Sequence, residues 1–144
     1  AMIDHGAHGM YLTEWFCGMP DTASSIFTVA CEREDTLALN VDRVEDNAVT
    51  IMGYNNGCIA INESGFVSTG YPHTLEVCGE GGRLMFDNQK VYICTDKSKI
   101  LREVELEEAQ PLPIIQFCTD NILEGCGMAD AKKLTKIMEM AYGN

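Results

Sequence analysis

The chain has 144 residues, of which 46% are apolar, enough to bury one sizeable core and too few for two comfortable domains. Its 22 acidic and 10 basic residues give a formal net charge of -12, which repels phosphate backbones and anionic lipid headgroups. We therefore expect neither nucleic acid nor a membrane surface as a partner, and no apolar run approaches the ~18 residues that span a bilayer.

The first predicted element is a helix over residues 2–17, where apolar residues recur at helical spacing until residues 18–20, Gly-Met-Pro, end it. One strip of this helix carries Asp4, His8, Tyr11, Leu12 and Trp15. Gly6 and Gly9 weaken the helix in isolation, so packing must hold it. Such glycines suit an element whose first turn approaches a ligand.

Period-two patterns after Pro20 predict a series of short β-strands. The predicted strands cover residues 25–32, 48–54, 59–68, 74–78, 83–86, 90–95 and 100–106. Asn56-Gly57 lies between the second and third, and both residues tolerate the positive φ of a type I′ hairpin turn. The short connections predict a meander and hence an antiparallel sheet.

Two more helices are predicted, one opened by Pro111 and Pro113 and running through Leu123, and one over residues 129–142. The order of helix, strands and two helices predicts an α+β fold, a two-layer domain with a large open, mainly antiparallel sheet covered on one face by helices. The other sheet face also carries apolar residues, as in the strand 59–68, so we expect it to pack on another subunit.

The seven cysteines do not predict a disulfide framework, because their number is odd, their positions are dispersed and none has C-x-x-C spacing. We expect small buried cysteines in a reducing compartment, and therefore a cytoplasmic protein.

Asp4 and His8 are the strongest candidates for chemistry. At i, i+4 their side chains lie on adjacent helical turns, and a carboxylate beside an imidazole fixes the ring tautomer and raises its basicity. Such a histidine can remove a proton from a hydroxyl. An i, i+4 pair that only stabilises the start of a helix remains open on spacing alone.

Other candidates give weaker signals. His5 and His8 with Asp4 could ligate a metal if His73 or a cysteine completed the set. The segment Tyr71-Pro72-His73 offers a hydroxyl and an imidazole where a loop could face a cleft or form an ordinary rim. The glycine-rich residues 79–82 lie between two short strands with no following helix, so they predict a hairpin turn and no nucleotide loop.

The order of several segments resembles the C-terminal domain of the glucose–fructose oxidoreductase and inositol dehydrogenase (Gfo/Idh/MocA) family. Residues 1–20 contain the D-x-G-x-H pattern and the W-[FL]-x-G-x-P ending of that domain's first helix. The similarity continues through residues 46–49, 56–60, 75–84, 121–125 and 141–142.

The resemblance implies the substrate-binding and oligomerisation domain, residues 1–144, of a two-domain oxidoreductase whose N-terminal Rossmann domain is absent from this chain. It implies Asp4 and His8 as catalytic residues beside the nicotinamide of NAD or NADP, and Tyr71 as a weaker substrate contact. We add His73 and Tyr11 as substrate-contact candidates. The family's sugar and inositol dehydrogenases often carry an acidic residue at the position of Tyr11, so other carbonyl or cyclic alcohol substrates stay open.

Three hypotheses follow. The first is a fragment of an NAD(P)-dependent dehydrogenase, inactive alone, that assembles as a homodimer or tetramer through the open sheet face. The second is a non-enzymatic dimerisation or ligand-binding module in which Asp4 and His8 are structural. The third is a metal-binding domain around His5 and His8.

Overall fold

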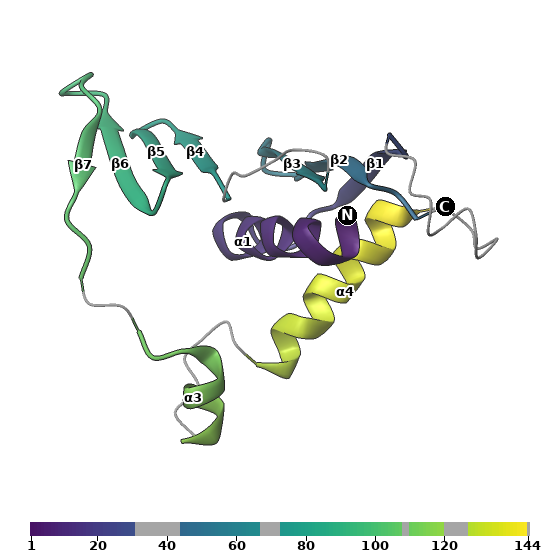
Figure 1. Cartoon of the computed structure of the whole chain (residues 1–144). Coiled ribbons are helices and arrows are strands. Elements are labelled where there is room, and N and C mark those ends of the chain that lie inside the picture. Colours follow the sequence, from purple (N-terminus) through teal and green to yellow (C-terminus); the bar gives the residue numbers. More distant parts are fainter. Residues whose placement is uncertain (31–43, 67–72, 108–109, 120–126, 144) are drawn as a thin grey trace. The chain divides into compact units, whose positions relative to one another are not determined.

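The structure is a computed structural model that describes residues 1–30, 44–66, 73–107, 110–119 and 127–143. Contacts divide the chain into two compact units, one formed by Ala1–Thr69 with Pro113–Asn144 and one by Gly70–Leu112. The α+β class is confirmed, because helices accompany two antiparallel sheets (Figure 1). The assignment of all residues to a single domain stays a prediction.

The first unit begins with the predicted helix, which the structure divides in two. A π-helical turn, η1 (Met2–Gly6), leads directly into α1 (Ala7–Cys17). The helix ends as predicted at Gly18, whose φ of 78° lies in the left-handed region that favours glycine. The Gly18 N–H donates to the Glu14 carbonyl at 2.7 Å and closes the last turn.

The rest of this unit is one sheet and two helices. The sheet has the order β1-β2-β3 and is formed by β1 (Thr22–Thr28), β2 (Asn47–Gly53) and β3 (Ile59–Gly65), all antiparallel. The helices are α3 (Pro113–Cys118) and α4 (Met128–Tyr142). The first strand thus begins earlier than predicted, and its predicted end at residues 31–32 lies outside the described residues.

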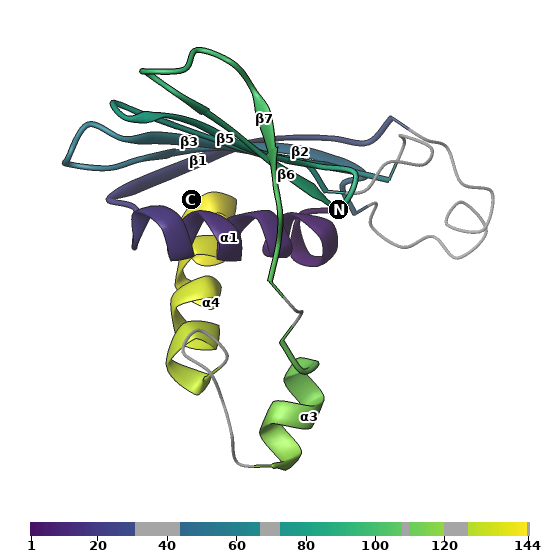
Figure 2. The same ribbon diagram turned by 90° about the vertical axis from the view of Figure 1, so that its left-hand side faces the viewer.

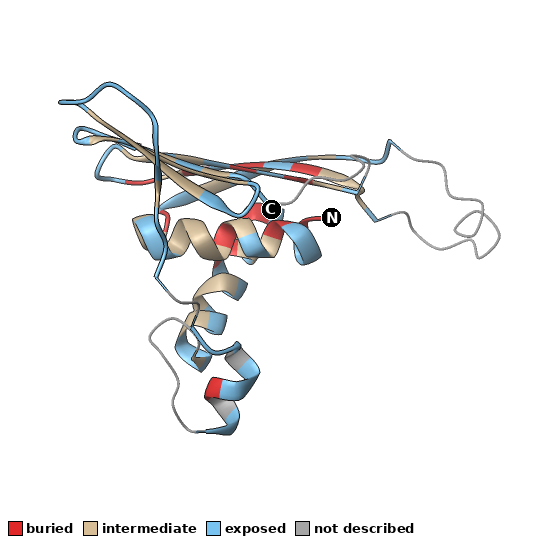
Figure 3. Cartoon of the chain, turned by 60° about the vertical axis from the view of Figure 1, so that its left-hand side comes forward, coloured by how far each residue is buried: buried red, intermediate tan, exposed pale blue. Residues whose placement is uncertain are grey.

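Helices α1 and α4 lie on the same face of the three-stranded sheet (Figures 1 and 2). Helix α1 packs against β3 and α4 against β1, so the predicted covering of one sheet face is confirmed for this sheet. Buried residues gather where these layers meet (Figure 3). The core consists of Met2, Met10, Ala48, Met52, Tyr54, Ile137 and Ala141.

The strip of α1 that faces the core differs from the one the sequence pattern favours. Met2, Gly6 and Met10 are buried, whereas Asp4, His8 and Trp15 are exposed. Gly6 and Gly9 lie on the face of the helix that packs against the sheet, because a β-carbon at either position would contact a side chain of β3. An added Cβ at Gly6 would lie 2.9 Å from the Ser64 hydroxyl oxygen, and one at Gly9 would lie 2.8 Å from Cγ of Asn62. The two glycines therefore allow close packing of β3 against the helix, and they do not open space for a ligand.

The β2–β3 hairpin forms as predicted, but its turn is not of type I′. The Gly57 N–H donates to the Tyr54 carbonyl at 2.9 Å, and the Tyr54 N–H donates to the Cys58 carbonyl at 3.2 Å. The loop between these two residues therefore has three residues. Of the three loop residues only Gly57 has a positive φ, 87°, as in a type I turn followed by a left-handed glycine. The Asp21 carboxylate, which accepts the Asn55 N–H at 2.6 Å, holds this longer loop.

The second unit described is a four-stranded antiparallel sheet in the order β4-β5-β6-β7. Its strands are β4 (Leu75–Gly79), β5 (Gly82–Asp87), β6 (Lys90–Thr95) and β7 (Arg102–Val104). Asn88 and Gln89, between β5 and β6, both have positive φ, 48° and 63°, so a turn of the I′ kind occurs here. Residues 79–82 form the predicted hairpin turn between β4 and β5. Among the described residues no helix is both long and apolar enough for a bilayer crossing.

Candidate active site

Asp4 and His8 lie on consecutive turns at the start of the first helix, in η1 and in the first turn of α1 respectively. The Gly6 N–H donates to the Ala1 carbonyl at 3.2 Å, an i to i+5 bond that defines the π turn around Asp4. Both side chains are exposed. The pair is therefore presented on the side of the helix that faces away from the core.

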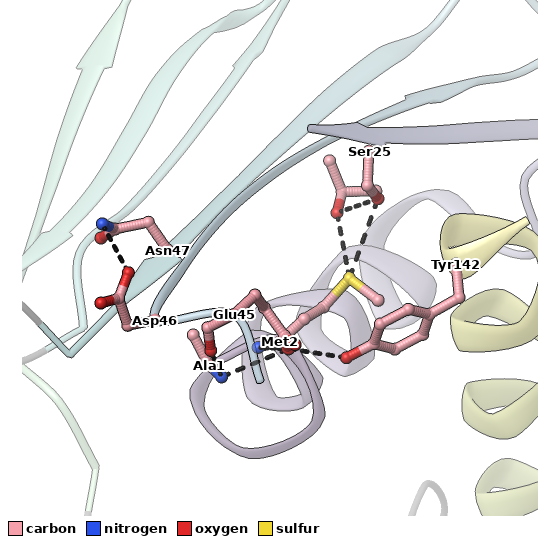
Figure 4. A network of polar contacts seen from close by, with 8 residues as sticks. Ala1, Met2, Ser25, Glu45, Asp46, Asn47 and Tyr142 are labelled. Atoms are coloured by element: carbon pink, nitrogen blue, oxygen red, sulfur yellow. Dashed lines mark hydrogen bonds and ion pairs between the residues drawn. The ribbon is translucent and has the colours of Figure 1, made fainter. Parts of the chain in front are cut away.

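Glu45 holds the buried side of this turn (Figure 4). Its Oε1 accepts the Met2 N–H at 3.1 Å and the Tyr142 hydroxyl at 2.7 Å, and also pairs with the Ala1 amino group at 3.3 Å. The Glu45 side chain is only 10% exposed. One carboxylate thus ties η1 to the end of α4.

The environment of Glu45 also sets its pKa. Burial acts to raise the pKa of the carboxyl group, but the hydrogen bonds from Tyr142 and from the Met2 N–H outweigh it, so the Glu45 pKa is lowered. The pKa of Tyr142 is raised to about 12. Burial of the hydroxyl is the main cause, and its hydrogen bond to Glu45 is the second. The Tyr142 ring stacks on Phe27 of β1 with centroids 5.0 Å apart.

A second anchor joins the turn to the strands beneath it. The Met2 side chain is fully buried, and its sulfur receives the Thr50 hydroxyl at 3.5 Å and the Ser25 hydroxyl at 3.8 Å (Figure 4). Asn62 of β3 donates its side-chain amide to the Gly6 carbonyl at 2.9 Å. Contacts from β1 and β2 therefore hold the Met2 side chain, and one contact from β3 holds the backbone between Asp4 and His8.

The remaining candidates are not all brought to this place. Tyr11 lies one turn beyond His8 on α1 and is half-buried. His73 is exposed just before β4, in the second unit, and Tyr71 lies outside the described residues. His5 contacts the Phe66 ring, with centroids 4.8 Å apart. In the part of the chain that the structure describes, no group of three His, Cys, Asp or Glu side chains could hold a metal ion, so the alternative metal site gains no support.

The residues that the sequence reasoning missed are those that position the pair, Glu45, Asn62 and Tyr142. Asn62 leaves no signal, because Ile59 and Ile61 alternate with it and the sequence gives no sign that the polar face of this strand is the buried one. Glu45 and Tyr142 leave none, since their contact joins positions 97 residues apart.

Comparison with known proteins adds three observations. A family model described as GFO/IDH/MocA C-terminal domain matches residues 1–85. No curated protein sequence matches significantly. Solved structures with the same fold include proteins described as oxidoreductases, and their low sequence identity supports the fold alone.

Three of these structures illustrate the likeness. One described as an oxidoreductase of Thermotoga maritima has a TM-score of 0.76 at 16% identity, over 95% of this chain and 42% of its own. An oxidoreductase from Agrobacterium radiobacter in complex with NAD+, L-tartaric acid and magnesium has a TM-score of 0.70 at 14% identity, over 99% and 46%. UDP-N-acetylglucosamine 3-dehydrogenase from Acidithiobacillus ferrooxidans has a TM-score of 0.69 at 17% identity, over 94% and 44%. This chain thus spans less than half the length of each.

The Glu45 contact makes a testable prediction about stability. Glu45→Gln removes the charge that receives the Tyr142 and Met2 donors, so we expect it to lower the free energy of unfolding at pH 7 by about 2 kcal/mol. Because the folded pKa of Glu45 is lowered, its contribution is present above the unfolded value of 4.5 and is lost as pH falls through the folded pKa. Urea unfolding at pH 7 and at pH 3.5, set roughly one unit below that value, measures both.

Tyr142→Phe is the matched control, since it keeps the stacked ring and removes only the hydroxyl. The two substitutions together should cost less than the sum of their separate costs. An equal deficit of Glu45→Gln at both pH values, or strict additivity with Tyr142→Phe, would contradict this role for Glu45.

Proposed function

Since the chain belongs to the GFO/IDH/MocA C-terminal domain family, we propose that it is the substrate-side domain of a two-domain NAD(P)-dependent oxidoreductase. The substrate we infer is a sugar-like or other cyclic alcohol, or the corresponding carbonyl compound. The observation that carries the proposal is that Asp4 and His8 are exposed at a turn that Asn62 of β3 holds by its backbone and that Ser25 and Thr50 hold through the Met2 side chain.

The chemistry proposed for this pair is proton exchange with a substrate hydroxyl. Interconversion of an alcohol and a carbonyl needs a base for the hydroxyl proton, and an imidazole does this near neutral pH. Asp4, one turn before His8, would orient the ring and stabilise its charged form. Tyr11, Tyr71 and His73 are the residues we propose as substrate contacts, Tyr11 because it lies on the same helix one turn on.

Among the described residues, the glycine-rich loop does not fit a dinucleotide. Phosphate-binding glycine loops join a strand to a helix N-terminus, whereas residues 79–82 join β4 to β5. We therefore propose that the hydride acceptor, NAD or NADP, is held by a separate dinucleotide-binding domain, and that this chain is inactive alone. Two structures with this fold, an oxidoreductase in complex with NAD+ and a UDP-N-acetylglucosamine 3-dehydrogenase, support the proposal by analogy.

Substitution of His8 tests the proposed role. In a protein that unites this domain with a dinucleotide-binding domain, His8→Asn should lower kcat about 10²- to 10⁴-fold, the usual contribution of a general base. Thermal stability should change little, because the His8 side chain is exposed. Steady-state kinetics with thermal unfolding measures both effects.

The control is His5→Asn, which removes an exposed imidazole from the preceding turn and should leave kcat within about threefold, since surface substitutions are usually mild. A His8→Asn variant with normal kcat would contradict the proposal and favour a structural pair. Saturable binding of NADH to the 144-residue chain at micromolar concentration, followed by fluorescence, would contradict the division between two domains.

We further propose that the face of β1-β2-β3 opposite the helices binds a second copy of the chain, giving a homodimer or tetramer. Exposed positions of all three strands place large apolar side chains on this face, namely Ile26, Val49, Ile51, Ile59 and Ile61. The register makes the patch continuous, because Ile26 pairs with Val49 and Ile51 with Ile61. An apolar patch of this kind suits a self-complementary contact.

The dimer proposal predicts the effect of one charge. Ile61 is 68% exposed and pairs with Ile51 on the neighbouring strand. A glutamate at this position would place an unpaired charge in the buried interface of the dimer. We expect Ile61→Glu to reduce the mass measured by light scattering to that of the monomer. Ile114→Glu, at a 62% exposed position of α3, is the control and should leave the mass unchanged.

A monomeric unsubstituted chain, or an oligomer that survives Ile61→Glu, would contradict this use of the sheet face.

The location we propose is the cytoplasm, supported by the free state of all the described cysteines.

A further inference from the structure

Two of the cysteines lie side by side in the first unit. Cys17 is the last residue of α1, Cys58 directly precedes β3, and their sulfur atoms are 3.6 Å apart. Both are partly buried against the core. The expectation of buried cysteines is wrong for the five that are described, since each of them is exposed or partly exposed. This pair combines proximity with access.

We propose that Cys17 and Cys58 form a reversible, oxidant-sensitive dithiol site, at which a hydroperoxide converts the two thiols into a disulfide that links the end of α1 to the start of β3.

The geometry favours this pair over other pairings that the structure describes. A disulfide requires sulfur atoms about 2.05 Å apart, so Cys17 and Cys58 must approach by about 1.5 Å, which small side-chain rotations supply. Cys78 and Cys94 both align with Arg83 of β5 from opposite sides. They are thus two strand spacings apart, about 9.5 Å, beyond the ~7 Å limit for bridging.

The surroundings of the two thiols favour reaction with each other. Burial and the neighbouring Cys58 raise the pKa of Cys17, so only a small fraction of this thiol is the reactive thiolate at neutral pH. Tyr54, next to the pair, has a buried hydroxyl with no hydrogen-bond partner among the described residues, and burial raises its pKa to about 12. Once one sulfur is oxidised, the other lies only 3.6 Å away and can attack it.

The reaction balances with the peroxide as the oxidant. One thiolate attacks a peroxide oxygen, the O–O bond breaks, and a sulfenic acid forms with release of an alcohol or water. The second thiol then attacks the sulfenic sulfur, the S–S bond forms, and water leaves. Two thiols are oxidised by two electrons in total, and one peroxide is reduced. An external dithiol reverses the reaction by exchange.

The experiment treats the purified chain with a small excess of hydrogen peroxide, digests it without reduction, and identifies linked peptides by mass spectrometry. We expect a peptide joining Cys17 to Cys58 as the main intramolecular link, removed by dithiothreitol. Closing the loop between these positions should raise the Tm by about 10 °C in a thermal scan of the oxidised chain.

Matched variants separate this pair from general thiol oxidation. Cys17→Ser and Cys58→Ser should each abolish the link and the rise in Tm, whereas Cys78→Ser, at an exposed cysteine on β4, should retain both. Because peptide mapping of the unsubstituted chain is decisive alone, a variant that fails to fold does not weaken the test. Oxidation that links other cysteines first, or that converts Cys17 and Cys58 to unlinked sulfinic acids, would overturn the proposal.

Discussion

The close approach of the first helix to β3 is the constraint on which the rest of the first unit depends. Asn62 reaches from the strand to the Gly6 carbonyl, and the absence of side chains at Gly6 and Gly9 lets the two backbones come this near. A buried amide must be hydrogen-bonded, so the same contact both fills space and satisfies Asn62. Packing of Met2 and Met10 into the core follows from this approach.

The helix is held again at both ends by charged groups. At its start Glu45 joins the Met2 N–H to the Tyr142 hydroxyl, and near its end Glu14 pairs with Lys133 of α4 at 2.8 Å. Both ties lead to α4, so α1, α4 and the sheet form one set of mutual supports. These contacts use the inner side of the helix, and Asp4 and His8 are exposed on the outer side. That arrangement is what a site for an external ligand requires.

Local patterns in the sequence were sufficient for the type and order of the described elements, whereas the catalytic role of the candidate pair stays a prediction. Alternation predicted the strands, glycine and proline their limits, and the spacing of Asp4 and His8 placed both on adjacent turns. The turn at Asn56-Gly57 was predicted wrongly, because the Asp21 carboxylate captures Asn55 from outside the hairpin. The sequence did not indicate which side of α1 packs against the sheet, because Gly6 and Gly9 are equally compatible with close approach of a strand and with close approach of a ligand.

The positioning residues were out of reach for a different reason. Glu45, Tyr142 and Asn62 act through contacts between segments far apart in the chain, and helical or strand periodicity carries no information about such pairs. The same holds for Cys17 and Cys58, which sequence spacing left as unrelated cysteines.

A double-mutant cycle at Gly9 and Asn62 tests the central claim, that contact between the glycine face of the helix and β3 fixes the turn carrying Asp4 and His8. Gly9→Ala alone should lower the free energy of unfolding by about 2 kcal/mol, because the added methyl group overlaps Asn62. Asn62→Ala opens the space that the methyl group needs. We predict that the double variant is more stable than additivity requires by at least about 1 kcal/mol in urea unfolding. Additive losses would contradict the account.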